Sequence, residues 1–184
     1  DLCKQGVGAH GAQALAAAMA GNRHVKSALL GADHLGDRGA LAVADIMRTS
    51  AVETVYLGCN AIGDLGAEAL AEGLRASQGR IKALWLKRNR LGAAGLRALT
   101  SALEASAGLR TLDLVSNDLG PEGLSILAPQ LAKGAVSVLF LCGNRLGIEG
   151  ARMLGEILAQ APGIVALFAG GNEFGDEGAR ALAD

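Results

Sequence analysis

The chain has 184 residues, of which 51% are hydrophobic and 19% are charged, and its formal net charge is −1. This near balance of charge argues against a protein that coats nucleic acid or an anionic membrane. No apolar run approaches the roughly 18–20 residues of a membrane span, so we expect no membrane contact.

A repeated segment runs through the whole chain. Residues 2–11 (LCKQGVGAHG) are the end of a first copy. Fuller copies follow with starts 27 to 29 residues apart, at residues 25–39, 52–66, 81–95, 109–123, 136–150 and 164–178. About seven units of one kind are therefore expected, and stacking lets such units share a core that none can form alone.

Each copy predicts a short strand, a turn and a helix. Apolar residues at its fourth and sixth positions, such as Leu112, share one face of a strand. The ninth position is asparagine in five copies and Asp33 in another, where the side chain can satisfy backbone groups of a buried turn. Glycine at the twelfth position suits a positive φ, and apolar residues at helical spacing follow, as in residues 67–74. In the fifth copy Pro129 predicts a helix that kinks or ends near Ala128.

The pattern LxxLxLxxNxLGxxG, followed by an Ala- and Leu-rich helical stretch, resembles the leucine-rich repeat. It is most similar to the ribonuclease-inhibitor-like subclass, which is also found in NOD-like receptors, tropomodulins and Ran GTPase-activating proteins. The resemblance implies an α/β solenoid, a curved horseshoe segment with parallel strands on the concave face and helices on the convex face. We expect one leucine-rich-repeat domain over residues 1–184, with partial repeats at both ends, as a fragment of a larger protein.

Signals of catalysis, metal or cofactor binding are weak. The stretch GVGAHG (6–11) matches GxGxxG, but no βαβ unit with a suitably placed acidic residue supports a dinucleotide site. The three histidines do not converge on a metal or a nucleophile. The three cysteines fall near the ends of different strands, which predicts free thiols and a reducing, cytoplasmic compartment. We expect no catalytic residue, no metal site and no cofactor.

The fifth position of each repeat points away from the core, into the concavity. Along the array it is occupied by Leu29, Tyr56, Trp85, Asp113, Phe140 and Phe168. Four of the five aromatic residues thus share one position, although aromatic residues make up only 3% of the chain. Two interpretations stay open. Neighbouring rings can stabilise the sheet, and exposed rings can form the energetic centre of a protein interface.

Basic residues gather around the fourth repeat. Residues 73–103 contain seven Lys and Arg and no Asp or Glu. Lys87 and Arg88 directly follow the strand of Trp85, which predicts an anchor for an acidic or aromatic segment of a partner. Asp113 would orient a basic group of the same partner. A solvated basic belt is the alternative interpretation.

These features predict a non-catalytic module that binds a protein partner on its concave face. The predicted contact residues are Tyr56, Trp85, Lys87, Arg88, Asp113, Phe140 and Phe168. Concave aromatic and charged residues commonly contact ligands in the resembled family, which favours the same interpretation. The alternatives are the sensing or autoinhibitory repeats of a NOD-like receptor-type switch, the targeting domain of a bacterial effector, and a GTPase-activating protein. Binding of single-stranded nucleic acid by Trp85 and the basic belt is chemically conceivable, but the near-zero net charge argues against it.

Overall fold

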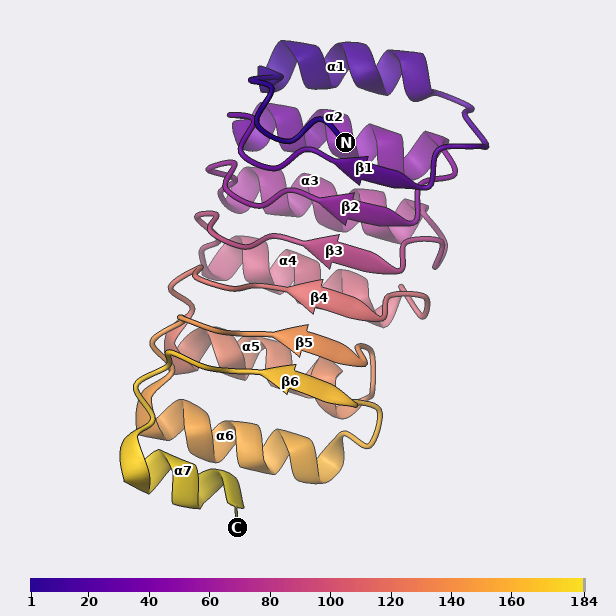
Figure 1. Cartoon of the computed structure of the whole chain (residues 1–184). Helices are drawn as coiled ribbons and strands as arrows, with labels where there is room; N and C mark the ends of the chain where they lie inside the picture. Colours follow the sequence, from indigo (N-terminus) through magenta and orange to yellow (C-terminus); the bar gives the residue numbers. More distant parts are fainter. Residues whose placement is uncertain (184) are drawn as a thin grey trace.

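A computed structural model describes residues 1–183, which form one layer of strands and one layer of helices (Figure 1). Asp184, the last residue of the predicted domain, lies outside the described residues. The strands of the described part are β1 (Ser27–Leu29), β2 (Thr54–Tyr56), β3 (Ala83–Trp85), β4 (Thr111–Asp113), β5 (Val138–Phe140) and β6 (Ala166–Phe168). Its helices are α1 (Gly8–Met19), α2 (Gly36–Thr49), α3 (Asp64–Ala76), α4 (Ala93–Glu104), α5 (Gly120–Ala132), α6 (Gly147–Gln160) and α7 (Gly175–Ala183).

The strands form a single parallel sheet in chain order, from β1 to β6. Adjacent strands lie about 4.8 Å apart, whereas packed helices need about 8–10 Å. The stack therefore bends toward the sheet, and the strands line the inner, concave side. This arrangement confirms the predicted α/β solenoid. The first repeat extends the hydrogen bonding of the sheet beyond β1. The N–H of Leu2 donates to the carbonyl of Leu29 and that of Lys4 to the carbonyl of Gly31, each at 2.9 Å.

The core lies between the two layers and is continuous from α1 to the end of α6. In the fourth repeat Leu84 and Leu86 on the strand side are fully buried, and Leu96 and Leu99 meet them from α4. The buried apolar residues form one cluster that spans the stack. Each repeat therefore gains its core from its neighbours, as the repeat pattern predicts.

Helix α5 passes through Pro129 and continues to Ala132, so it does not end near Ala128. Pro129 stands in the last turn of the helix, on its exposed side. Its ring removes the N–H that would bond the carbonyl of Ser125, which is also exposed. Water can replace that one lost bond, which is why the helix tolerates this proline.

The twelfth-position glycine enters the helix in two conformations. Gly63 and Gly92 have φ of −103° and −88°, which departs from the predicted positive value. Both donate their N–H to an aspartate at the start of the preceding helix, Gly63 to Asp37 Oδ1 at 2.7 Å and Gly92 to Asp64 Oδ1 at 2.8 Å. At Gly36, Gly120, Gly147 and Gly175, where the preceding helix offers no such aspartate, φ is positive as predicted, and it is positive at Gly8 as well.

A ladder of buried asparagines joins neighbouring repeats. Its members are Asn60, Asn89, Asn117, Asn144 and Asn172. Asn60 illustrates the pattern: its Nδ2 donates to the carbonyl of Leu57 at 3.0 Å and to that of Leu30, one repeat earlier, at 2.7 Å. Its Oδ1 accepts the N–H of Asp33 at 2.9 Å. The predicted satisfaction of the turn is confirmed, and it crosses the boundary between repeats.

Asp33 occupies this ladder position in the second repeat, but its carboxylate can only accept. Oδ1 accepts the N–H of Gln5 at 2.8 Å and of Gly6 at 2.9 Å. Oδ2 is buried and has no hydrogen-bond partner among the described residues. At this place in five other repeats, the asparagine Nδ2 donates hydrogen bonds to backbone carbonyls, as at Asn60. Asp33 Oδ2 has no hydrogen to donate, so this repeat lacks those bonds.

We therefore expect Asp33→Asn to raise the free energy of unfolding by about 1 kcal/mol, because the amide regains the missing donor. Urea denaturation at neutral pH measures the change. Asp37→Asn, which alters an aspartate already bonded to Gly63, is the control and should not stabilise the protein. A less stable Asp33→Asn variant would contradict the assignment.

Candidate functional site

Strand pairing places the fifth-position residues in one row across the sheet. Tyr56 pairs with Leu29 on one side and with Trp85 on the other, and Asp113, Phe140 and Phe168 continue the row on β4, β5 and β6. The fourth-position residue beside each is directed to the helices, as at fully buried Val55 and Leu84. The row therefore lies on the strand face that the helices leave uncovered.

The aromatic rings of this row lie close to one another. The ring centroids of Tyr56 and Trp85 are 6.4 Å apart, and those of Phe140 and Phe168 are 4.4 Å apart with nearly parallel planes. Trp85 and Phe140 stand on β3 and β5, about 10 Å apart at two strand spacings, yet their centroids are separated by 5.2 Å. Their rings therefore lean together over β4. Phe168 keeps 47% of its surface exposed.

Asp113 lies on β4 beneath these leaning rings and is only 2% exposed. Its Oδ1 accepts the N–H of Val115 at 2.8 Å. The expectation of an open carboxylate that orients a partner's basic group is therefore not met in this structure, because neighbouring side chains cover it. Burial raises the pKa of Asp113 above its ordinary value, since loss of water disfavours the charged form, and the Val115 N–H and the charge of Lys87 oppose this rise.

Asp113 predicts a pH dependence of stability. Because its folded pKa is raised above 3.8, the folded protein binds this proton more tightly than the unfolded chain does. Stability from this group is greatest at low pH and is lost as the pH rises through the folded pKa. We expect Asp113→Asn to be more stable than the unaltered chain at pH 7, and the difference to shrink as the pH falls toward 3.8.

Urea denaturation between pH 3.5 and 7 tests this prediction. Asp176→Asn is the control: Asp176 is exposed in the first turn of α7, where a negative charge is favourable, so this variant should not be more stable than the unaltered chain at pH 7. An Asp113→Asn difference that grows as the pH falls would contradict the stated cause.

Lys87 and Arg88 follow β3 at the edge where the strands end. Lys87 Nζ lies 5.6 Å from the centroid of the Tyr56 ring, within the range of a cation–π contact. Arg88 is exposed and takes a φ of 52°. The structure thus brings Lys87 together with the aromatic row and leaves Arg88 accessible beside it.

A hollow of about 500 Å³ opens at this same edge, over the ends of β1, β2 and β3. Tyr56, Lys87 and Arg88 line it together with Lys4 and Cys59. Lys4 and Cys59 were not among the residues predicted for the site.

Two glycines at the seventh position make the hollow possible. A Cβ on Gly31 would lie 2.9 Å from Cδ1 of the Tyr56 ring, and a Cβ on Gly58 would lie 2.9 Å from Cγ of Lys87. The next three repeats carry Lys87, Val115 and Cys142 at the equivalent position, and the last carries Gly170, where a Cβ would meet no neighbouring atom within 4 Å. Glycine at the seventh position of two successive repeats was the signal in the sequence for this hollow.

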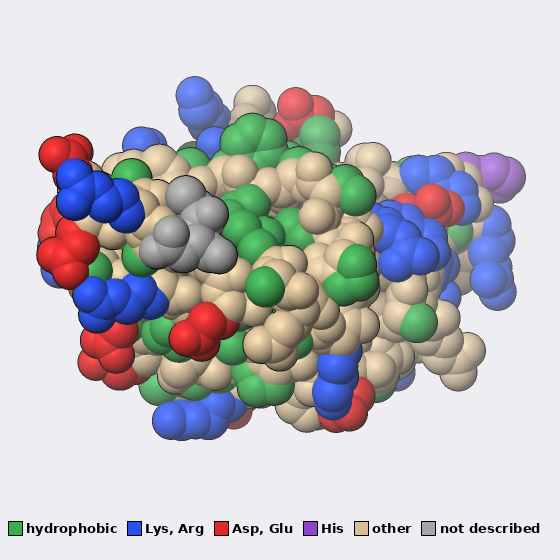
Figure 2. Space-filling view, turned by 90° about the horizontal axis from the view of Figure 1, so that it is seen from below, with side chains coloured by type: hydrophobic (Ala, Val, Ile, Leu, Met, Phe, Trp, Pro, Cys, Tyr) green, Lys and Arg blue, Asp and Glu red, His purple; other side chains and the backbone are tan. Residues whose placement is uncertain are grey.

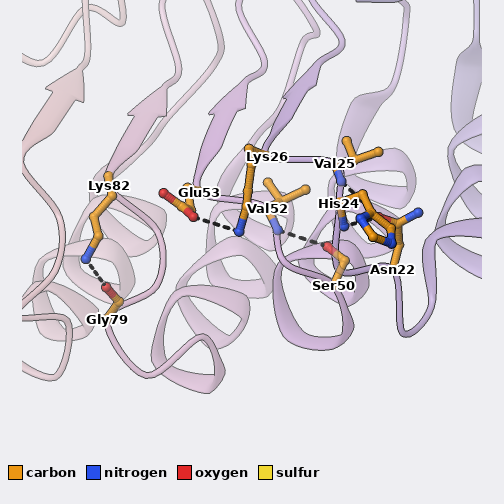
Figure 3. Close-up of polar contacts among 9 residues, drawn as sticks. All are labelled: Asn22, His24, Val25, Lys26, Ser50, Val52, Glu53, Gly79 and Lys82. Atoms are coloured by element: carbon orange, nitrogen blue, oxygen red, sulfur yellow. Dashed lines mark hydrogen bonds and ion pairs between the residues drawn. The ribbon is translucent and has the colours of Figure 1, made fainter.

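The opposite edge of the sheet, where the strands begin, holds a carboxylate that is already paired (Figure 3). Lys26 Nζ lies 2.9 Å from Glu53 Oε1. Hydrogen bonding to Lys26, together with its charge, lowers the pKa of Glu53. Lys82 donates to the carbonyl of Gly79 at 2.8 Å instead of to a carboxylate.

Other chemistry is sparse in the part of the chain that the structure describes. No group of three or more His, Cys, Asp or Glu there could hold a metal ion. Cys3, Cys59 and Cys142 are free cysteines. None of the described helices combines the length and the apolar character needed to cross the bilayer.

Viewed from the α7 end of the stack, hydrophobic side chains occupy the middle of the surface and charged side chains gather around its rim (Figure 2). Leu167 of β6 and Phe174, just before α7, are only partly buried. An apolar centre with a charged rim is expected at this end, because each repeat packs an apolar surface against its neighbour.

Comparisons with known proteins agree with this architecture. A leucine-rich-repeat family model matches residues 52–71, 108–128 and 170–183. A ribonuclease inhibitor of Sus scrofa is 34% identical over 150 residues, which is 79% of this chain and 33% of that protein. A ribonuclease inhibitor of Mus musculus is 41% identical over 87 residues, which is 46% of this chain and 19% of that protein. The chain thus spans a third or less of the length of these relatives. With its repeat pattern and its two-layered parallel solenoid, the chain belongs to the leucine-rich-repeat proteins, in the ribonuclease-inhibitor-like subclass.

Proposed function

We propose that this chain is a non-catalytic module that binds a protein partner through its concave strand face. The observation that carries the proposal is the row of rings on the uncovered face, from Tyr56 to Phe168, with Lys87 and Arg88 beside it. Large aromatic side chains and arginine are the residue types that dominate the binding energy of protein interfaces. The two relatives are ribonuclease inhibitors, that is, proteins that act on another protein.

Sheet stabilisation alone explains the row less well. Strand propensity is met equally by Val, Ile or Thr, which are smaller and expose less apolar surface. Tyr56, Trp85 and Phe140, on inner strands of the sheet, stay partly exposed although each lies against a neighbouring ring. An apolar side chain that stays exposed after stacking still has contact area to offer a partner.

Affinity capture from a lysate of the source cell tests the proposal. The unaltered chain is compared with the double variant Trp85→Ala/Arg88→Glu and with Arg97→Glu, an exposed residue of α4 in the helix layer. Circular dichroism first checks that all three fold. We expect a partner that the unaltered chain and Arg97→Glu retain and that the double variant loses.

Hydrogen exchange on the captured complex then locates the interface. Protection is expected at the strand ends of β2, β3 and β5, and not on the outer surface of α4. A partner that all three proteins retain, or protection confined to the helices, would contradict the proposal.

A further inference from the structure

The hollow beside Tyr56 has a chemical character that the proposed function does not specify. Lys4, Lys87 and Arg88 place three cationic side chains on its lining, and no Asp or Glu lines it. Tyr56 adds an aromatic surface, and the backbone at Gly31 and Gly58 has no side chain to fill the space. We propose that this hollow binds an acidic segment of a protein partner, rich in glutamate or aspartate; this inference rests on the proposed function.

The cations of the hollow are not neutralised by carboxylates of the chain itself. The ion pairs among the described residues join six other cations to acids, and none involves Lys4, Lys87 or Arg88. Of the nearby acids, Asp33 and Asp113 are buried. The charge of Lys87 acts on Asp113, but no ion pair joins the two side chains. The positive charge at this edge is therefore available to an external anion.

The shape of the hollow is built by the fold and does not depend on mobile surface side chains alone. The N–H of Lys4 donates to the carbonyl of Gly31 at 2.9 Å, which holds that segment against β1. The Tyr56 ring covers Gly31, and the stem of Lys87 packs over Gly58. Lys87 is further held by its contact with the Tyr56 ring. A carboxylate entering here meets cations that are already positioned, which lowers the entropic cost of binding.

The same charges act against a different class of partner. Proteins that bind RNA present Lys and Arg to the phosphate backbone, and such a surface would be repelled by Lys4, Lys87 and Arg88. Like charges brought together at an interface cost affinity and slow association. The hollow therefore selects a partner segment of opposite charge, and it disfavours the cationic, RNA-binding surface of a nuclease.

Fluorescence titration with defined peptides tests the inference directly. The chain contains a single tryptophan, Trp85, which neighbours Tyr56 and so reports on the site without a label. The probes are a ten-residue peptide with five glutamates and one phenylalanine, the matched glutamine peptide, the matched lysine peptide and a ten-nucleotide oligothymidine. We expect the glutamate peptide to bind at least tenfold more tightly than each of the others, and its affinity to fall with added salt.

Three variants distinguish binding in the hollow itself from non-specific attraction to the positive charge of the surface. Lys87→Glu/Arg88→Glu should weaken the glutamate peptide at least tenfold, whereas Arg97→Glu should change its affinity less than twofold. Gly31→Ala keeps every charge but displaces the Tyr56 ring, and it should weaken binding severalfold. Circular dichroism and urea denaturation confirm folding, and peptide anisotropy replaces Trp85 emission if a variant alters the emission itself.

Equal binding of the glutamate and glutamine peptides would overturn the inference. So would tighter binding of the oligonucleotide, or an equal loss of affinity in Arg97→Glu and the double charge reversal. A partner captured through Trp85 and Arg88 from a lysate, together with no binding of the glutamate peptide, would leave the proposed function intact and remove this inference alone.

Discussion

Replacing Asn89 by alanine is expected to lower the free energy of unfolding by about 4 kcal/mol, because several buried backbone groups lose their partners at once. Nδ2 of Asn89 donates to the carbonyls of Leu57 at 3.0 Å and Leu86 at 2.9 Å. Its Oδ1 accepts the N–H of Asn60 at 3.1 Å and of Ile62 at 3.0 Å. Three of these four groups belong to the preceding repeat, so the substitution weakens the junction between the third and fourth repeats.

Urea denaturation followed by circular dichroism measures this loss, with Asn22→Ala as the control. Asn22 also accepts two N–H groups, from His24 and Val25, each at 2.9 Å, but in an exposed turn. Water replaces those bonds, so the control should cost less than about 1 kcal/mol. Asn89→Asp keeps the acceptor and loses the donor, and we expect an intermediate value. A cost for Asn89→Ala no larger than that of Asn22→Ala would show that the ladder does not hold the repeats together.

Gly108→Ala is expected to cost about 3 kcal/mol, because its new Cβ would collide with backbone that has little freedom to move. A Cβ at Gly108 overlaps the carbonyl oxygen of Gly79 and would lie 2.8 Å from the Cα of Gly79. Gly79 itself has a φ of 78°, the left-handed region that favours glycine. The turns that precede β3 and β4 are thus packed backbone against backbone.

Gly163 gives a position-matched control. It occupies the same place relative to its repeat, and it packs against Gly134, whose φ of 76° matches that of Gly79. A Cβ at Gly163 would approach the Cα of Gly134 at 3.3 Å, which a shift of a few tenths of an ångström relieves. Gly163→Ala should therefore cost less than about 1 kcal/mol. Equal urea midpoints for the two variants would contradict the close approach at Gly108.

The amino-acid sequence by itself predicts the repeat unit with its strand, turn and helix, and the row of fifth-position side chains. These features depend on the spacing of residues within one unit, and the same spacing recurs in several copies of that unit. Asn89 shows how far such reasoning reaches. The sequence of one repeat shows that its buried turn requires an amide side chain. It does not show that the side chain of Asn89 bonds Leu57, Asn60 and Ile62, which become its neighbours only when repeats stack.

The tertiary structure decided what happens between units. Asp113 has the same place in its repeat as Trp85 and Phe140, yet it is covered because those two rings lean together across β4. Gly63 has the same place as Gly36 but a different φ, because only Gly63 faces an aspartate on the preceding helix.

The hollow shows the same dependence on neighbours. It combines Lys4 and Lys87 with glycines of the two repeats between them. Contacts of this kind join residues that are one to three repeats apart, so they cannot be predicted from the residue pattern of a single unit. The sequence therefore determined the shape of the solenoid and the face that remains uncovered, and packing between repeats determined which side chains of that face are accessible and which charges they present.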